Sequence, residues 1–229
     1  MLATLMQQLM QLKPSQSRVV AVTDLTALFR KNINIPQLRL FTHRHAGVDF
    51  DTVSIGGHHD SDEDSIDIHV IYHPDQQHID MFGLDWSRLA FDLAECIGHE
   101  LVHRAQQKRK RKPLAKYRSQ DLDPQKKQDQ EYLGSAEEIE AYGYSIAAEL
   151  AAKHHMFTLD ESALDTVVMY RVYVTTFDTD QNIVLKLHKQ ISKYLRRLEV
   201  DYNDKNNSRQ RPVTGTRRSR SPGRSGGRK

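Results

Sequence analysis

Residues 86–103, WSRLAFDLAECIGHELVH, contain the pattern that decides the fold of this chain. Apolar residues recur at helical spacing along this stretch, which predicts one helix over about 86–107 with a single face buried in a core. These apolar residues are Trp86, Leu89, Ala90, Leu93, Ile97 and Leu101. His99 and His103 fall nearly opposite that face, so we expect the helix to present both imidazoles to a cleft.

The five residues His99-Glu100-Leu101-Val102-His103 form an HExxH motif. Two imidazoles one helical turn apart can both reach a single ion at about 2.0 to 2.1 Å. Glu100 is rotated away from the histidines, so it stays out of the coordination sphere but can take a proton from a metal-bound water. We therefore predict His99 and His103 as Zn²⁺ ligands and Glu100 as the catalytic base. The alternative interpretation is a surface helix with two solvated histidines.

A hydrolytic zinc site needs a third protein ligand and an open fourth position. No histidine follows at the HExxHxxGxxH spacing, which argues against a site whose third ligand is a histidine shortly after the motif. The best candidates lie in residues 135–150, SAEEIEAYGYSIAAEL, where Glu140 sits in a stripe of small residues that lets two helices approach closely. We predict Glu140 as the third ligand, with Glu137 as the alternative, because Glu138 lies on the other flank of the core face. Any of the three could instead be part of the acidic first turn of a helix capped by Ser135.

The combination of HExxH with a later Glu140-Ala141 on a second helix resembles the gluzincin branch of the zincin metallopeptidases. It is also similar to the small metallopeptidases encoded by tailed bacteriophages. The resemblance covers about residues 65–150 and implies a zincin-like fold, a peptide or protein substrate, zinc ligands at His99, His103 and Glu140, and Glu100 as general base. Thermolysin-like members carry an aspartate four residues after the glutamate ligand to orient a histidine. Here that position is Tyr144, so the residues that support the ligands must differ.

The chain as a whole is expected to be an α+β protein: a mainly helical zincin-like domain with a small three-stranded antiparallel or mixed sheet before the metal-binding helix. Alternation predicts the three strands, with a turn at Gly56-Gly57. Their expected ranges are 38–42, 48–55 and 66–72. Helices are expected over residues 1–12, 23–32, 86–107, 135–153, 164–176 and 182–200, with a polar connection between the third and the fourth.

Net charge divides the chain into two parts. Residues 205–229 hold nine Lys or Arg and no acid, which leaves 24 Lys and Arg against 30 Asp and Glu, or −6, in residues 1–204. We therefore expect one zincin-like domain over 1–203 and a disordered Arg/Ser/Gly-rich tail over 204–229. Such a tail can bind nucleic acid by neutralising phosphates, or it can simply be a solubilising terminus. The candidate contacts are Arg217, Arg218, Arg220 and Arg224.

Several further residues have less specific roles. Cys96 is the only cysteine, which excludes an intramolecular disulfide, and a small buried hydrophobe is its expected role. Residues 58–64 are expected to form a solvated loop, with a second cation site as the alternative, and the basic residues 108–112 to end the metal helix. The group that stabilises an oxyanion is left open among five residues, namely Tyr132, Tyr142, Tyr144, His154 and His155.

The N-terminus lacks the basic leader of a signal peptide, and no apolar run approaches 18 residues. These features predict a cytoplasmic protein, in the host cytoplasm if a phage encodes it, without a membrane partner. A zinc-dependent metallopeptidase is the predicted function. The alternative is a non-catalytic, zinc-stabilised binding or regulatory protein that contacts nucleic acid through its tail.

Overall fold

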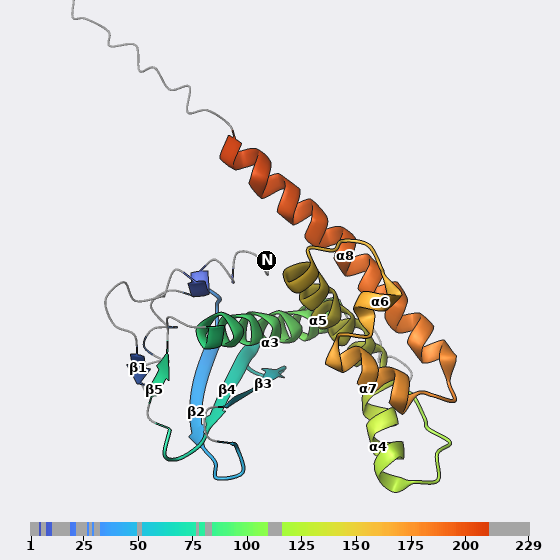
Figure 1. Cartoon of the computed structure of the whole chain (residues 1–229). Helices are drawn as coiled ribbons and strands as arrows, with labels where there is room; N and C mark the ends of the chain where they lie inside the picture. Colours follow the sequence, from blue (N-terminus) through green and yellow to red (C-terminus); the bar gives the residue numbers. More distant parts are fainter. Residues whose placement is uncertain are drawn as a thin grey trace, which may run out of the picture.

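The computed structural model of the chain describes residues 33–49, 52–76, 78–80, 84–109 and 116–210, together with 5, 8–10, 19–21, 27 and 29. Most of the helices expected over 1–12 and 23–32 lie outside these ranges. The described part is an α+β structure, in which a small mixed sheet precedes a long helix and a group of further helices (Figure 1). This confirms the expected fold class.

Three strands form the main sheet: β2 (Leu38–Arg44), β3 (Val53–Asp60) and β4 (Ser65–Tyr72). Strand β4 is central, with β2 parallel to it on one side and β3 antiparallel to it on the other. Every second residue of β4 is buried, and these are Ile66, Ile68, Val70 and Tyr72. The alternation that predicted this strand therefore marks the sheet face that joins the core. Two short strands, β1 (Val19–Ala21) and β5 (His78–Asp80), pair antiparallel and were not predicted.

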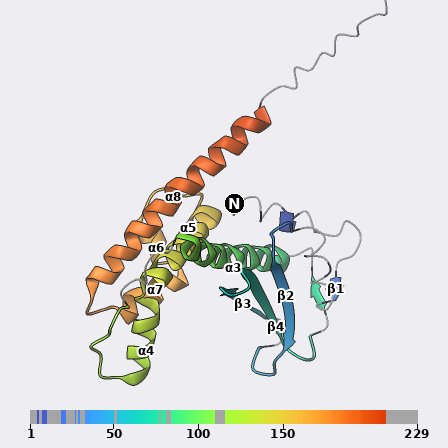
Figure 2. The ribbon, with the colours of Figure 1, turned by 180° about the vertical axis from the view of Figure 1, so that it is seen from behind.

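Helix α3 (Leu84–Arg109) lies across one face of this sheet (Figures 1 and 2). Its predicted apolar face is in the core, with Trp86 only 1% exposed and Leu93 and Ile97 fully buried. The helix contacts β3 and β4 on that side and α5 on another. Burial of large side chains such as Trp86 contributes roughly 1.5 to 3 kcal/mol each, which fixes the rotation of α3 about its axis.

The remaining helices are α4 (Pro124–Leu133), α5 (Ala136–His154), α6 (Glu161–Leu164), α7 (Val168–Thr176) and α8 (Gln181–Gln210). Helix α4 lies in the segment expected to be a polar connection; Asp123 caps it, and its side chain accepts a hydrogen bond from the backbone N–H of Lys126. Ser135 caps α5 as predicted. The single helix expected over 164–176 is divided into α6 and α7.

Two expectations about boundaries were wrong. Gly56 and Gly57 do not form a turn but lie inside β3, paired with His69 and Ile68 of β4. Helix α8 continues to Gln210, so residues 204–210, expected to begin the tail, are helical. This long helix projects beyond the other helices (Figure 1). Residues 211–229 lie outside the described ranges, and none of the helices within those ranges has the length and apolar content needed to span a bilayer.

Candidate metal centre

The two histidines of the HExxH motif point toward one another from successive turns of α3. The Nε2 atoms of His99 and His103 are 3.1 Å apart. Two nitrogens that bind the same tetrahedral zinc ion at about 2.0 to 2.1 Å are separated by roughly 3.3 to 3.4 Å. The two imidazoles are therefore already oriented to share one ion.

Glu138 of α5 completes this group. One carboxylate oxygen, Oε1, lies 3.5 Å from Nε2 of His103, and the other, Oε2, lies 3.7 Å from Nε2 of His99. A ligand atom from each of the three residues lies within 4.8 Å of the others, and no other group of this kind occurs in the described ranges. Oε2 of Glu138 is buried and has no hydrogen-bond partner among the described residues. A buried carboxylate oxygen without a donor is costly, and a cation between these groups would remove that cost, so the residues fit a metal ion.

The prediction that Glu140 is the third ligand does not agree with this geometry. The Glu140 carboxylate accepts hydrogen bonds from Lys193 (2.6 Å) and Tyr194 (3.1 Å), both on α8. The stripe of small residues that suggested Glu140 packs against α8 instead of α3, since a Cβ on Gly143 would lie 2.5 Å from Cβ of Gln190. Glu137, the alternative, lines a cleft beside His99 and His103 but is not one of the three clustered residues.

Helical spacing explains why α5 presents Glu138 to α3. Glu138, Tyr142 and Ser145 lie on one face of α5, at intervals of four and three residues. All three contact the HExxH motif. The rings of Tyr142 and His99 meet edge to face with their centroids 4.7 Å apart, and Ser145 Oγ lies 3.1 Å from Nδ1 of His99. Burial alone would raise the pKa of Glu138, but the contacts with His103 and His99 outweigh it and lower the pKa to about 2.

Glu100 is 6% exposed and projects toward strand β3. Burial is the main cause that raises its pKa above the ordinary value of 4.5. A Cβ on Gly57 would lie 2.7 Å from Cγ of Glu100 and 2.8 Å from Sγ of Cys96, so only glycine lets β3 approach α3 this closely. Sequence reasoning missed this role of Gly57, although paired glycines inside an alternating strand are a known signal of close backbone approach.

Two clefts meet at His99 and Glu100. One, of about 490 Å³, is bordered by His58, Tyr132 and Glu138, among others. The other, of about 560 Å³, follows β3 from Gly57 to Val53. Gly57, His99, Glu100 and Tyr132 line both of them. The group of His99, His103 and Glu138 therefore lies where the two clefts meet.

Of the five residues considered for an oxyanion, two line these clefts. Tyr132, which is 53% exposed, borders both clefts, and Tyr142 borders the second. Tyr144 is buried behind α3, where a Cβ on Gly98 would meet its hydroxyl. His154 contacts Thr166 at 3.1 Å, and His155 ends α5 in the left-handed conformation, so neither takes part in the group around His99.

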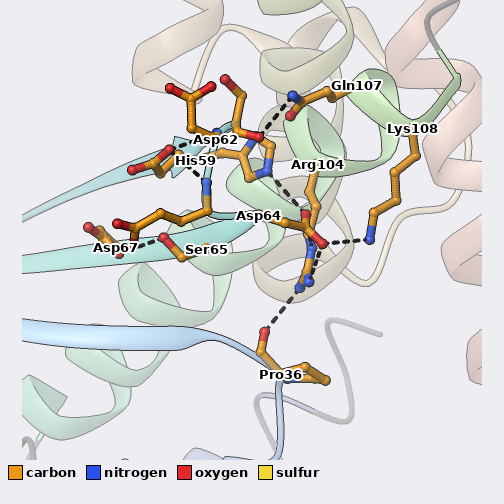
Figure 3. Close-up of polar contacts among 12 residues, drawn as sticks. Pro36, His59, Asp62, Asp64, Ser65, Asp67, Arg104, Gln107 and Lys108 are labelled. Carbon is orange, nitrogen blue, oxygen red and sulfur yellow. Dashed lines mark hydrogen bonds and ion pairs between the residues drawn. The ribbon is translucent and has the colours of Figure 1, made fainter.

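Of residues 58–64, expected to form a solvated loop, 58–60 are the end of β3 and 61–64 form the turn to β4, which is exposed except at the half-buried Asp64. Asp64 accepts two hydrogen bonds from Arg104 of α3 (2.7 and 2.8 Å) and forms an ion pair with Lys108 (3.0 Å), as Figure 3 shows. Gln107 also donates to the carbonyl of Ser61. These contacts hold the β3–β4 hairpin against α3. Hydrogen bonds from Arg104 are the main cause that keeps the pKa of Asp64 well below its ordinary value.

Cys96 is partly buried and borders the second cleft, and burial raises its thiol pKa, as expected for an unreactive cysteine. The tail residues Arg217, Arg218, Arg220 and Arg224 lie outside the described ranges, so nucleic-acid binding by them stays a prediction. Comparison with family models, curated proteins and solved structures finds no match for this chain. The assignment of the site therefore depends on its own geometry.

Proposed function

We propose that this chain is a zinc-dependent metallopeptidase. The observation that carries the proposal is the convergence of His99 Nε2, His103 Nε2 and the Glu138 carboxylate beside the buried Glu100. Two imidazoles, one carboxylate and an open side toward a cleft are the donor set of hydrolytic zinc sites. When bound, zinc polarises a scissile carbonyl and lowers the pKa of a bound water.

Glu100 is the general base of this proposal. It lies one residue from His99 on α3, borders both clefts, and is not one of the three clustered ligands. From this position its carboxylate accepts a proton from the attacking water and passes that proton to the leaving amine. Burial raises the pKa of Glu100, which favours a carboxyl group that must hold a proton before it returns it to the leaving amine.

The proposed substrate is an extended peptide segment. Strand β3 pairs with β4 on one side only, so within the described ranges its other edge has free backbone N–H and C=O groups. Residues 53–57 of this strand line the second cleft. A peptide that adds to the edge of β3 would receive main-chain hydrogen bonds and place its backbone next to Glu100. Tyr132 borders both clefts, which supports it as the proposed donor of a hydrogen bond to the developing oxyanion.

Substitution Glu100→Gln tests the function. We expect peptide hydrolysis to fall by about 10² to 10⁴-fold, because the base is lost, while zinc stoichiometry and the thermal unfolding midpoint are retained. Glu149→Gln is the matched control, since it removes a glutamate of α5 that forms an ion pair with Lys153 and is not one of the three clustered residues. Activity should be assayed on a mixed peptide library by mass spectrometry.

Two outcomes would reject the proposal. Full activity in Glu100→Gln would show that another group acts as base. A wild-type protein that binds zinc but cleaves no peptide in the library would favour the alternative, a zinc-stabilised binding module.

A further inference from the structure

The ring nitrogen of each histidine that faces away from the proposed ion has a side-chain partner. Nδ1 of His103 lies 3.0 Å from Oε1 of Gln106, one turn further along α3. Nδ1 of His99 lies 3.1 Å from Oγ of Ser145 on α5. Gln106 is 6% exposed and Ser145 is 4% exposed, so water does not compete strongly for either contact.

The environment of Gln106 determines the direction of its hydrogen bond. Its amide nitrogen donates to the carbonyl oxygen of Glu137 (2.9 Å) and to Oε2 of Glu140 (3.2 Å). Both partners are acceptors, so the NH₂ group must face them and Oε1 must face His103. Because Oε1 can only accept, Nδ1 of His103 carries the proton, and Nε2 keeps its lone pair for the ion.

Helix α8 holds the carboxylate that orients Gln106. The Glu140 carboxylate accepts from Lys193 and Tyr194 on α8 at the same time as it accepts from Gln106. Two donors from α8 therefore fix the orientation of the Glu140 carboxylate, and this carboxylate in turn fixes the orientation of the Gln106 amide. Glu140 therefore has a structural role, orienting Gln106, without binding the metal.

A similar arrangement supports His99. Glu95 lies one turn before His99 on α3 and borders the second cleft with it; burial raises the pKa of Glu95, and a hydrogen bond from Ser145 opposes that rise. When the single hydroxyl proton of Ser145 is donated to Glu95, the oxygen lone pairs remain to accept from Nδ1 of His99. Both histidines thus have an acceptor on Nδ1 that is itself connected to a carboxylate.

We propose that Gln106, held by Glu140, and Ser145, beside Glu95, are positioning residues that keep both imidazoles protonated on Nδ1 and direct both Nε2 atoms at one metal ion. This inference rests on the proposed metal centre but not on peptidase activity. Partners outside the coordination sphere typically change metal affinity by about 10 to 100-fold.

The first test compares Gln106→Met with Gln107→Met. The two substitutions make the same chemical change at adjacent positions of α3, but within the described ranges the side chain of Gln107 donates a hydrogen bond only to the carbonyl oxygen of Ser61. We expect the dissociation constant for Zn²⁺, measured by chelator competition at fixed pH, to rise by about 10 to 100-fold in Gln106→Met. It should change by less than about twofold in Gln107→Met. Equal affinities in wild type and Gln106→Met would overturn the inference.

A second measurement separates positioning from a general loss of stability. In the Co²⁺-substituted protein, protons on the ring nitrogens of bound histidines give paramagnetically shifted NMR signals, and a hydrogen bond slows their exchange with water. We expect two such signals in wild type, selective loss of one in Gln106→Met, and selective loss of the other in Ser145→Ala. Retention of both signals in both variants would contradict the proposed hydrogen bonds.

The outcomes distinguish this inference from the proposed function. A wild-type protein that binds no zinc or cobalt would overturn both. A protein that binds metal with the expected variant pattern but cleaves no peptide would reject only the peptidase proposal.

Discussion

The two faces of α5 carry one carboxylate each, and their surroundings differ. Glu138 faces α3, where within the described ranges its ion-pair partners are the imidazoles of His99 and His103, which carry a charge only when protonated. Glu140, two residues later, faces α8 and the end of α3, where Lys193 and Arg109 supply permanent positive charge. Both have a pKa lowered to about 2. The charge of Glu140 is compensated by the protein, whereas that of Glu138 is best compensated by an added cation.

The largest expected effect is a loss of zinc affinity, and it should differ between Glu138 and Glu140. Glu138→Ala should raise the dissociation constant for Zn²⁺ by more than about 100-fold, beyond the range of partners outside the coordination sphere, because it removes a ligand. Glu140→Ala should remain within about 10 to 100-fold, because it only loosens Gln106. Isothermal titration or chelator competition gives both values. A larger loss in Glu140→Ala than in Glu138→Ala would reverse the assignment.

A smaller effect is expected where β3 meets α3. Gly57→Ala places a Cβ 2.7 Å from Cγ of Glu100, so the base or the strand must move. We expect peptide hydrolysis to fall by about 10² -fold, the order of loss that follows from a misplacement of about 1 Å, with zinc binding retained. Gly56→Ala is the comparison variant, because it also adds a methyl group to the lining of the second cleft, but a Cβ there meets no described atom within 4 Å and leaves Glu100 in place. Similar activities in the two variants would mean that the approach of β3 to Glu100 is not required.

The smallest effect concerns stability in acid. Burial would raise the pKa of Glu140, but Lys193 and Gln106 outweigh it and lower the pKa from 4.5 to about 2. A carboxyl with a lowered folded-state pKa stabilises the fold above its unfolded pKa, and this contribution is lost as pH falls from about 4.5 toward 2. In metal-free protein, the difference in unfolding free energy between wild type and Glu140→Gln should therefore be constant above about pH 5 and shrink below it.

Urea unfolding between pH 6 and pH 2.5 measures that difference. The same experiment with Glu149→Gln controls for the loss of an exposed ion pair on the same helix. A difference that does not change with pH would show that the charge of Glu140 does not stabilise the fold.

Local periodicity predicted the parts of this molecule that depend on one element alone. The apolar face of α3, the alternation of β4 and the Ser135 cap of α5 are all set by residues close in sequence, and all three are present. The positions of His99 and His103 on one face of α3 follow from the same spacing.

Features that depend on how two elements pack were not predictable in this way. The small residues around Glu140 indicated a close helix approach, but the sequence does not say whether the neighbour is α3 or α8. The rotation of α5 that buries Ile146 and Leu150 also turns Glu138 toward the histidines. Gly57 acquires its role only because β3 crosses α3 beside Glu100. Pairing between distant elements decides each of these cases.

Anomalous diffraction at the zinc absorption edge, from crystals grown with one equivalent of Zn²⁺, tests the central claim most directly. We predict one site per chain, with zinc about 2.0 to 2.2 Å from Nε2 of His99, Nε2 of His103 and a carboxylate oxygen of Glu138, and Glu140 still bonded to Lys193. Zinc bound through Glu140, or no zinc between the two histidines, would contradict this account.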